Sequence, residues 1–419
     1  MSSKDFISQA LALAKKGKGK VAPNPMVGCV ITKKGKIIGE GWHKIYGKEH
    51  AEVNAIKDCQ AKFGKYKSRD LLKGSCFYVN LEPCSIKNNT PACTDSIIGV
   101  EAAKVICSIK DPNPRINGKG INKLRAAGIK VEVGSASNEA KELNKVFIVN
   151  QKLKRPFVTI KYAQTLDQMI GYQAKRGIQI SNALSKQDVQ NIRKEHSSIL
   201  IGANTLRLDN PRLTLRPESK IKIQPAKIIV GNNFGRLIQK NIFKNFSHIF
   251  FVTSEKLIVP EKYSNKVTCI QTNKRNGLQK LFKELMLRGY TSILVEGGKS
   301  IISSFIKKGY FDELIVYTAP RILGSKGLFS SALSIPALSF VPLNGCLSPS
   351  LFIILGSARS AVSKVVNLAL QSSHSLRRLI CVPSPTSLES ITFVSCAWQN
   401  GQCITYKLER LHRALQLLL

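Results

Sequence analysis

The stretch His50-Ala51-Glu52-Val53-Asn54-Ala55 begins a helical pattern, and the chain later reads Leu81-Glu82-Pro83-Cys84-Ser85, followed by Cys93. A short strand-like run, Cys76–Asn80, directly precedes the second stretch. One histidine and two cysteines can hold a Zn²⁺ ion and leave its fourth tetrahedral position to a water molecule. A site with an open position is catalytic, so the decisive feature of this chain is a predicted catalytic zinc site.

Glu52 adds a second chemical role to this group. It lies two residues after His50, where it can take a proton from the metal-activated water and return it to leaving ammonia. Any one of these residues alone is more often part of a core or a surface, and only their combination predicts a zinc deaminase. Nucleic-acid and nucleoside deaminases usually carry Pro-Cys-x-x-Cys, whereas eight residues separate Cys84 from Cys93 here. We therefore expect an extended loop beside the metal.

Composition limits the other possibilities. The 419 residues predict two or three domains, and the hydrophobic content of 43% is that of a globular protein. The net charge of +38 raises nucleic acid or an anionic membrane as partners, but the lysines are scattered without a dense block, so we expect neither. A positive field also favours phosphorylated small substrates. The 11 cysteines show no disulfide framework, and we find no signal peptide or membrane-length apolar run, which predicts a cytoplasmic protein.

The pattern along the chain indicates α/β architecture in two successive domains. From Pro23 to Gly134, short β-branched runs alternate with helical stretches, as in a layered α/β unit. The strand-like run Phe157–Tyr162 begins a second α/β unit, which places the boundary near residue 147. We expect domains at residues 1–146 and 147–328, followed by an atypical tail at residues 329–419.

Several motifs of the first domain resemble one known family. They are Ala22-Pro23-Asn24-Pro25-Met26-Val27-Gly28-Cys29-Val30, His50–Ala55, Leu81–Ser85, Thr90–Cys93, and Asp111–Pro114 with Gly118–Gly120. Together they resemble the deaminase half of the bifunctional deaminase/reductase family of riboflavin biosynthesis. The resemblance implies a cytidine-deaminase-like α/β/α fold. It also implies that His50, Cys84 and Cys93 bind zinc and that Glu52 shuttles protons.

The second domain continues the resemblance. Its motifs are Lys161–Asp167, Ile180–Asn182, Thr205, Asp209–Arg216 and the glycine turn Val295–Ser300, and it lacks the Gly-x-Gly-x-x-Gly fingerprint of a Rossmann domain. They resemble the reductase half of the same family, which implies a dihydrofolate-reductase-like α/β fold and NADPH as cofactor. The implied cofactor-binding residues are Ala163, Thr205, Asp209, Gly297, Gly298, Lys299 and Ser300. The implied substrate-binding residues are Arg193, Leu213, Arg216 and Glu296, with Arg216 as the phosphate clamp.

The family resemblance implies a complete function. The expected enzyme removes an amino group hydrolytically from a phosphoribosylaminopyrimidine and then reduces the ribosyl chain to a ribityl chain with NADPH. We expect the protein to bind this phosphorylated small molecule as its substrate. We also expect it to form a homo-oligomer. Two other possibilities are a tRNA-editing adenosine deaminase and an RNA-binding protein with a degenerate deaminase fold. The wide cysteine spacing disfavours the first, and the intact Glu52 disfavours the second.

Four positions and the tail depart from the family pattern. The family usually has His at Ile86 and Arg at Asn89 beside the zinc site, and Gly at Gln168 and Trp at Gln179 beside the nicotinamide site. We expect altered substrate contacts and weaker cofactor packing. Beyond Leu328 the chain is Ser-rich, and Glu389 and Glu409 are its only acidic residues. A shifted reading frame or a fused segment would produce this change, and the reductase sheet would then lack its last strands and expose an edge.

Overall fold

The computed structural model describes most of the chain up to residue 319 and isolated strands beyond it. The described residues are 2–87, 91–165, 167–172, 180–181, 183–218, 221, 223–234, 240–244, 247–259, 261–272, 276–319 and 323, together with strands β14 to β21. They form two compact units, Met1–Pro156 with Leu285–Thr291, and Phe157–Glu284 with Ser292–Leu419. Helix α7 (Lys145–Leu153), which a boundary near residue 147 would divide, lies within the first unit.

A mixed sheet forms the centre of the first unit. Its described strands, in the spatial order β2-β1-β3-β4-β5, are β2 (Lys36–Trp42), β1 (Gly28–Lys33), β3 (Cys76–Val79), β4 (Lys104–Cys107) and β5 (Lys130–Val133). Strands β1 and β2 form an antiparallel hairpin whose turn places Lys34 and Gly35 at φ values of 47° and 73°. Strands β3, β4 and β5 run parallel, so their carboxyl ends meet at one edge of the sheet.

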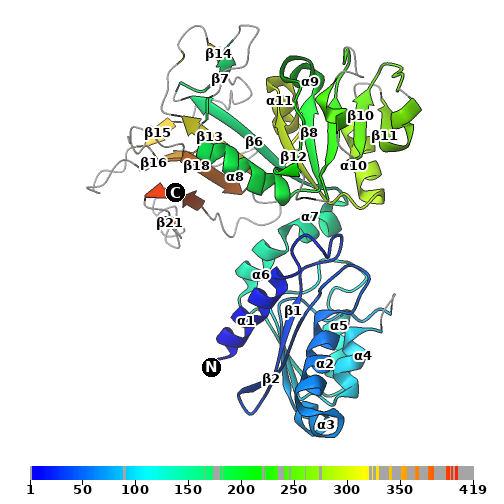
Figure 1. The fold of residues 1–419 in the computed structure, drawn as a ribbon. Coiled ribbons are helices and arrows are strands. Elements are labelled where there is room, and N and C mark those ends of the chain that lie inside the picture. Colours follow the sequence, from blue (N-terminus) through cyan, green and yellow to red (C-terminus); the bar gives the residue numbers. More distant parts are fainter. Residues whose placement is uncertain are drawn as a thin grey trace. The chain divides into compact units, whose positions relative to one another are not determined.

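Helices cover both faces of this sheet (Figure 1). They are α1 (Ser3–Lys15), α2 (Ala51–Phe63), α3 (Lys65–Leu72), α4 (Cys93–Gly99), α5 (Lys119–Ala126), α6 (Ser137–Leu143) and α7. One core packs α2 to α5 against residues such as Phe77 and Val105. The other packs α1 and α6 against Val30 and Ile106. Side chains that alternate along each strand thus supply both cores, and the expected α/β/α layering is confirmed.

The second unit contains a larger sheet. Within the described part of the chain its order is β11-β10-β9-β8-β12-β6-β13-β18-β19. The bounds are β11 (Val267–Gln271), β10 (Ile249–Thr253), β9 (Ala226–Val230), β8 (Ser198–Gly202), β12 (Ser292–Gly297), β6 (Phe157–Thr165), β13 (Glu313–Ala319), β18 (Leu376–Cys381) and β19 (Phe393–Cys396). In this spatial order, every pair of neighbouring strands from β11 through β6 to β13 is parallel. The expected second α/β unit is confirmed.

Helices and short strands complete this unit. They are β7 (Met169–Tyr172), α8 (Ala183–Lys194), α9 (Ala203–Asp209), η3 (Asn241–Lys244), η4 (Glu261–Lys266), α10 (Gly277–Leu287), α11 (Lys299–Lys307) and β14 (Gly327–Phe329). Ile192 of α8 packs against Leu294 and Ile315, whereas Leu206 of α9 packs against Ile201 and Ile229. None of the described helices is long and apolar enough to cross a membrane.

The edge of β13 differs from the sequence expectation. Strand β18 pairs with β13 in antiparallel register from Glu313 opposite Cys381 to Thr318 opposite Leu376, and β19 pairs with β18 in turn. The expected open edge at β13 is therefore not found in the structure. The remaining described strands of the tail are β15 (Ser339–Val341), β16 (Leu351–Leu355), β17 (Lys364–Asn367), β20 (Trp398–Gln399) and β21 (Gln402–Cys403). The atypical origin of residues 329–419 stays a prediction.

Gln168, one of the four departures from the family pattern, has a φ of 62° in the turn after β6. This left-handed conformation strains a side chain with a Cβ atom and suits glycine. We predict that Gln168→Gly stabilises the second unit by about 1 kcal/mol, which raises Tm by about 2–4 °C. The control Gln187→Gly, at an exposed position inside α8, should lower Tm instead. Calorimetry measures the Tm of both variants, and an equal decrease in Tm for both would contradict strain at Gln168.

Candidate active sites

The three candidate metal ligands of the first unit converge from separate elements. His50 directly precedes α2, Cys93 is the first residue of α4, and Cys84 lies in the turn after β3. His50 Nδ1 lies 3.2 Å from Cys93 Sγ and 3.5 Å from Cys84 Sγ. The three potential ligand atoms all lie within 4.8 Å of one another. The structure thus brings together the residues that the sequence analysis selected for zinc.

The charges in this group suit a zinc ion. The Cys93 thiol and the His50 ring hydrogen-bond to Cys84 and lower the pKa of its thiol to about 4. The hydrogen bond with Cys84, together with burial, raises the pKa of Cys93, so one thiolate and one thiol share this site. Zn²⁺ binds thiolate sulfur and imidazole nitrogen and would displace the remaining thiol proton. The donor set therefore fits zinc.

Glu52 lies beside the ligands in the first turn of α2. Its side chain is only 3% exposed. Burial raises the pKa of the Glu52 carboxyl, and the negative charge of Cys84 raises it further. A carboxyl whose pKa moves toward neutrality is better suited to take up and release a proton near pH 7. The position and environment of Glu52 are those of a proton shuttle.

His43 packs against His50, and Asn24 and Glu49 contact the His43 ring. The His43 ring packs edge-on against the His50 ring with centroids 5.3 Å apart. His43 Nε2 lies 3.3 Å from Asn24 Nδ2, and its Nδ1 lies 3.0 Å from the Glu49 carbonyl oxygen. Sequence reasoning gave Asn24 no role of its own, although it lies within the Ala22–Val30 motif. Of the nearby departures, Ile86 is half-buried, and Asn89 lies outside the described residues.

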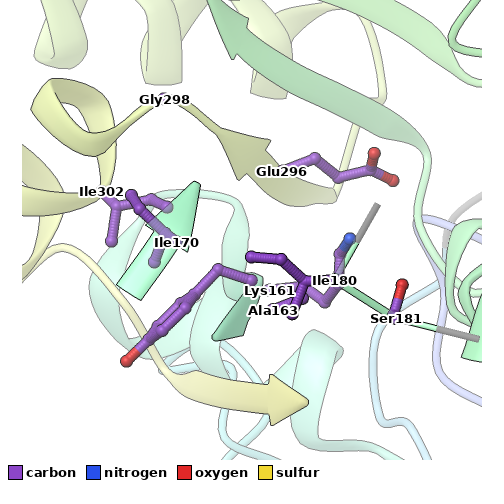
Figure 2. A pocket seen from close by; sticks show the side chains of 9 residues that line it. Lys161, Ala163, Ile170, Ile180, Ser181, Glu296, Gly298 and Ile302 are labelled. Atoms are coloured by element: carbon purple, nitrogen blue, oxygen red, sulfur yellow. The ribbon is translucent and has the colours of Figure 1, made fainter. Parts of the chain in front are cut away.

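The second unit contains a cavity of about 240 Å³ that is lined by residues of β6, β7, β12 and α11 (Figure 2). Its lining residues are Lys161, Tyr162, Ala163, Ile170, Ile180, Ser181, Glu296, Gly298 and Ile302. The cavity lies toward the carboxyl ends of parallel strands, where α/β sheets usually bind ligands. Three of the predicted site residues, Ala163, Glu296 and Gly298, face this cavity. The sequence analysis gave Lys161 no role of its own, although a charged residue in the middle of a largely buried strand is a detectable signal.

Arg193 and Glu296 form a bidentate ion pair beside this cavity. Arg193 Nε and Nη2 each donate to one Glu296 carboxylate oxygen at 2.6 Å, and Nη1 donates to the Thr214 carbonyl at 3.1 Å. The side chains are only 13% and 9% exposed. Burial alone would raise the pKa of Glu296, but the hydrogen bonds from Arg193 and the positive charges of Lys161 and Arg193 together lower it overall. Two residues that we expected to bind substrate separately are thus bound to each other.

The predicted cofactor residues lie mostly around the glycine turn before α11. A Cβ atom at Gly298 would lie 3.1 Å from Thr205 Oγ1, and one at Gly297 would lie 3.6 Å from it. Gly298 has a φ of 83°, which favours glycine, and it directly precedes the first residue of α11, Lys299. Backbone N–H groups at such a helix start can bind phosphate. The structure therefore brings Thr205 to the turn Gly297–Ser300.

The remaining predicted residues lie outside the set that lines the cavity. Asp209 and Arg216 are exposed, whereas Leu213 is buried in the core below α9. Burial of part of its surface raises the pKa of Asp209. The Arg216 backbone N–H donates to Gln190 Oε1 at 3.0 Å, and the positive charge of its exposed side chain contributes to lowering the pKa of Glu218, after the hydrogen bonds from Thr214 and Arg212. Gln179, the other departure near this site, lies outside the described residues.

Comparison with known proteins places these two sites in one family. Residues 1–109 match the cytidine and deoxycytidylate deaminase zinc-binding region, and residues 156–343 match the RibD C-terminal domain. The riboflavin biosynthesis protein RibD of Aquifex aeolicus is 37% identical over 324 residues, which cover 77% of this chain and 88% of that protein. The chain belongs to the RibD family. RibD of Escherichia coli is 32% identical over 78% of this chain and 89% of its own length.

Solved RibD structures agree with this assignment. A Thermotoga maritima structure, described as a diaminohydroxyphosphoribosylaminopyrimidine deaminase/5-amino-6-(5-phosphoribosylamino)uracil reductase, is 33% identical with a TM-score of 0.69. It covers 84% of this chain and 97% of its own. Acinetobacter baumannii RibD is 29% identical with a TM-score of 0.69, and covers 82% and 94%. RibD proteins are deaminase/reductase enzymes of riboflavin biosynthesis, so the predicted family and bifunctional class are confirmed.

The pairing of Arg193 with Glu296 generates a stability prediction. Glu296→Ala leaves a buried guanidinium without its partner, which should lower the free energy of unfolding of the second unit by about 3–5 kcal/mol. The double variant Arg193→Met with Glu296→Leu removes both charges and should be much less destabilised than the sum of its single variants. Urea unfolding of the three variants measures this coupling. Strictly additive losses would show that the pair does not act as a unit.

Proposed function

We propose that this RibD-family chain deaminates 2,5-diamino-6-(5-phosphoribosylamino)pyrimidin-4-one at the first site and reduces the product with NADPH at the second. The observation that best supports the proposal is the convergence of His50, Cys84 and Cys93 beside the buried Glu52. The same metal site would also suit a tRNA-editing deaminase, but the match of residues 156–343 to the RibD C-terminal domain supports the deaminase/reductase over the tRNA-editing and RNA-binding alternatives. We therefore propose a phosphorylated small molecule as the substrate.

In the deaminase half, we propose His50, Cys84 and Cys93 as the zinc ligands. Bound zinc would supply the Lewis acidity that makes a water molecule nucleophilic at neutral pH. Glu52 then accepts the proton of the attacking water and delivers it to the departing amino group, which leaves as ammonia. Because Glu52 is buried and its pKa is raised, the proton stays available for this second transfer.

In the reductase half, the chain mainly orients two ligands. We propose that Ala163, Thr205, Asp209 and the turn Gly297–Ser300 hold NADPH, which supplies the hydride. Glu296 lines the cavity and fixes Arg193, and these residues together with Leu213 and Arg216 would contact the substrate. Hydride transfer depends on alignment of donor and acceptor more than on acid–base groups. A fixed ion pair at the cavity wall suits this need.

The working state of the enzyme is a further part of the proposal. Seven cysteines between Cys29 and Cys269 are free, and four of them, Cys29, Cys59, Cys93 and Cys107, are buried, which suits a reducing compartment such as the cytoplasm. We also propose a homo-oligomer, for which light scattering on the purified protein is the direct measurement. A reducing environment would keep the two zinc-binding thiols available.

The role of Glu52 is tested by Glu52→Gln. This variant keeps every proposed ligand but cannot accept the proton, so deamination should fall by about 10²–10⁴-fold while bound zinc stays at the wild-type level. Ammonia release and metal analysis on the same sample provide the two readings. Near wild-type deamination would rule out Glu52 as the shuttle. Loss of zinc from the variant would mean that the substitution disturbs the metal site and not only the proton transfer.

The role of Arg216 is tested by Arg216→Ala. Loss of a guanidinium that binds phosphate should raise the KM of the reductase step by about tenfold or more, since a charge-assisted hydrogen bond contributes about 1.5–3 kcal/mol. Arg212→Ala is the matched control, because Arg212 is also exposed and lies in the same segment. Deaminase activity should stay unchanged in both variants. Equal KM values for the two variants would contradict a specific phosphate contact at Arg216.

A further inference from the structure

Glu82, two residues before the candidate ligand Cys84, has an unusually complete set of hydrogen bonds. Oε2 accepts from the backbone N–H groups of Asp111 at 3.0 Å and Gly118 at 2.9 Å. Oε1 accepts from those of Gly120 at 3.0 Å and Ile121 at 3.2 Å. The side chain is only 3% exposed. One buried carboxylate therefore joins the end of β3 to both ends of the segment 111–121.

A second, independent contact holds the same two segments together. A Cβ atom at Gly120 would lie 2.0 Å from the Pro83 carbonyl oxygen, so only glycine permits this approach. Gly120 is also in the first turn of α5, and Gly118 directly precedes that helix. Glu82 thus accepts from N–H groups at the start of α5, although it lies in the turn after β3, far from α5 in the sequence.

The turn that Glu82 fixes is the one that carries Cys84. The Cys84 carbonyl accepts from the Thr94 N–H at 3.1 Å, and the Cys93 N–H donates to Cys84 Sγ at 3.4 Å. The Glu82 N–H itself donates to the Ile109 carbonyl at 2.9 Å. Glu82 is therefore hydrogen-bonded to the segment 111–121, the backbone leads from it through Pro83 to Cys84, and Cys84 is hydrogen-bonded to Cys93 and Thr94.

We propose that Glu82 is a positioning residue of the deaminase site, which holds the Cys84 turn against the segment 111–121 and so sets the geometry of the two sulfur ligands. This inference rests on the proposed zinc-dependent deamination. Groups that orient metal ligands without touching the metal typically contribute 10–100-fold to metal affinity or activity. Glu82 contacts backbone N–H groups and no candidate ligand side chain, so it would act on Cys84 through the backbone of the turn.

Glu82→Gln tests the proposal with almost no change in shape. The amide offers one acceptor oxygen, so its NH₂ group must face two of the four N–H donors. We expect zinc transfer to a chromophoric chelator to be about 10–100-fold faster than in the wild type, and deamination to fall by a similar factor. NADPH-dependent turnover in the same chain should stay unchanged. Glu82→Asp, whose shorter side chain cannot reach both segments, should change zinc release in the same direction.

Leu124→Ala is the matched control for simple loss of stability. Leu124 is fully buried in α5, the helix that Glu82 caps, but it makes none of the Glu82 contacts. This variant should lower the Tm of the first unit and leave zinc release, measured well below Tm, near the wild-type rate. The proposal would be overturned if both Glu82 variants released zinc at the same rate as Leu124→Ala. Because chelator transfer needs no substrate, it separates failure of this inference from failure of the proposed reaction.

Discussion

The first unit depends on one constraint, the convergence of two thiol sulfurs and one imidazole nitrogen to within 4.8 Å of one another. These atoms come from the start of α2, the start of α4 and the turn after β3. Electron-rich ligands at two helix starts benefit from the positive ends of the helix dipoles. The same convergence places Glu52 in the first turn of α2, where burial raises the pKa of its carboxyl. Sheet, helices and turn therefore act together to position a few atoms.

The second unit depends on a ligand cavity and a buried ion pair instead of a cluster of metal ligands. A reductase must hold a large cofactor and an opened sugar chain in line, and parallel strands offer a natural binding edge at their carboxyl ends. Here the edge carries a buried ion pair, Arg193 with Glu296, next to the cavity. A buried pair of this kind adds little net stability but is costly to break. We therefore interpret it as a means of fixing the cavity wall.

The zinc cluster and both α/β folds could be predicted from the sequence because their signals are local. His50 and Glu52 share one helix turn, and a thiol ligand has few substitutes, so residue type and spacing almost determine the site. Partnerships between distant residues could not be predicted in this way. Arg193 and Glu296 each carry a recognisable charge, yet their mutual pairing depends on how α8 packs on β12. The four bonds of Glu82 and the pairing of β18 with β13 depend likewise on tertiary contacts.

The central claim is that one chain catalyses two successive reactions at two separate sites. The most direct measurement follows ammonia release and NADPH oxidation separately on the purified full-length protein with the phosphoribosylaminopyrimidine substrate. The account predicts ammonia release without NADPH, and, once NADPH is added, oxidation of one NADPH for each ammonia released. Ammonia release without any NADPH oxidation, or NADPH oxidation that precedes deamination, would contradict it.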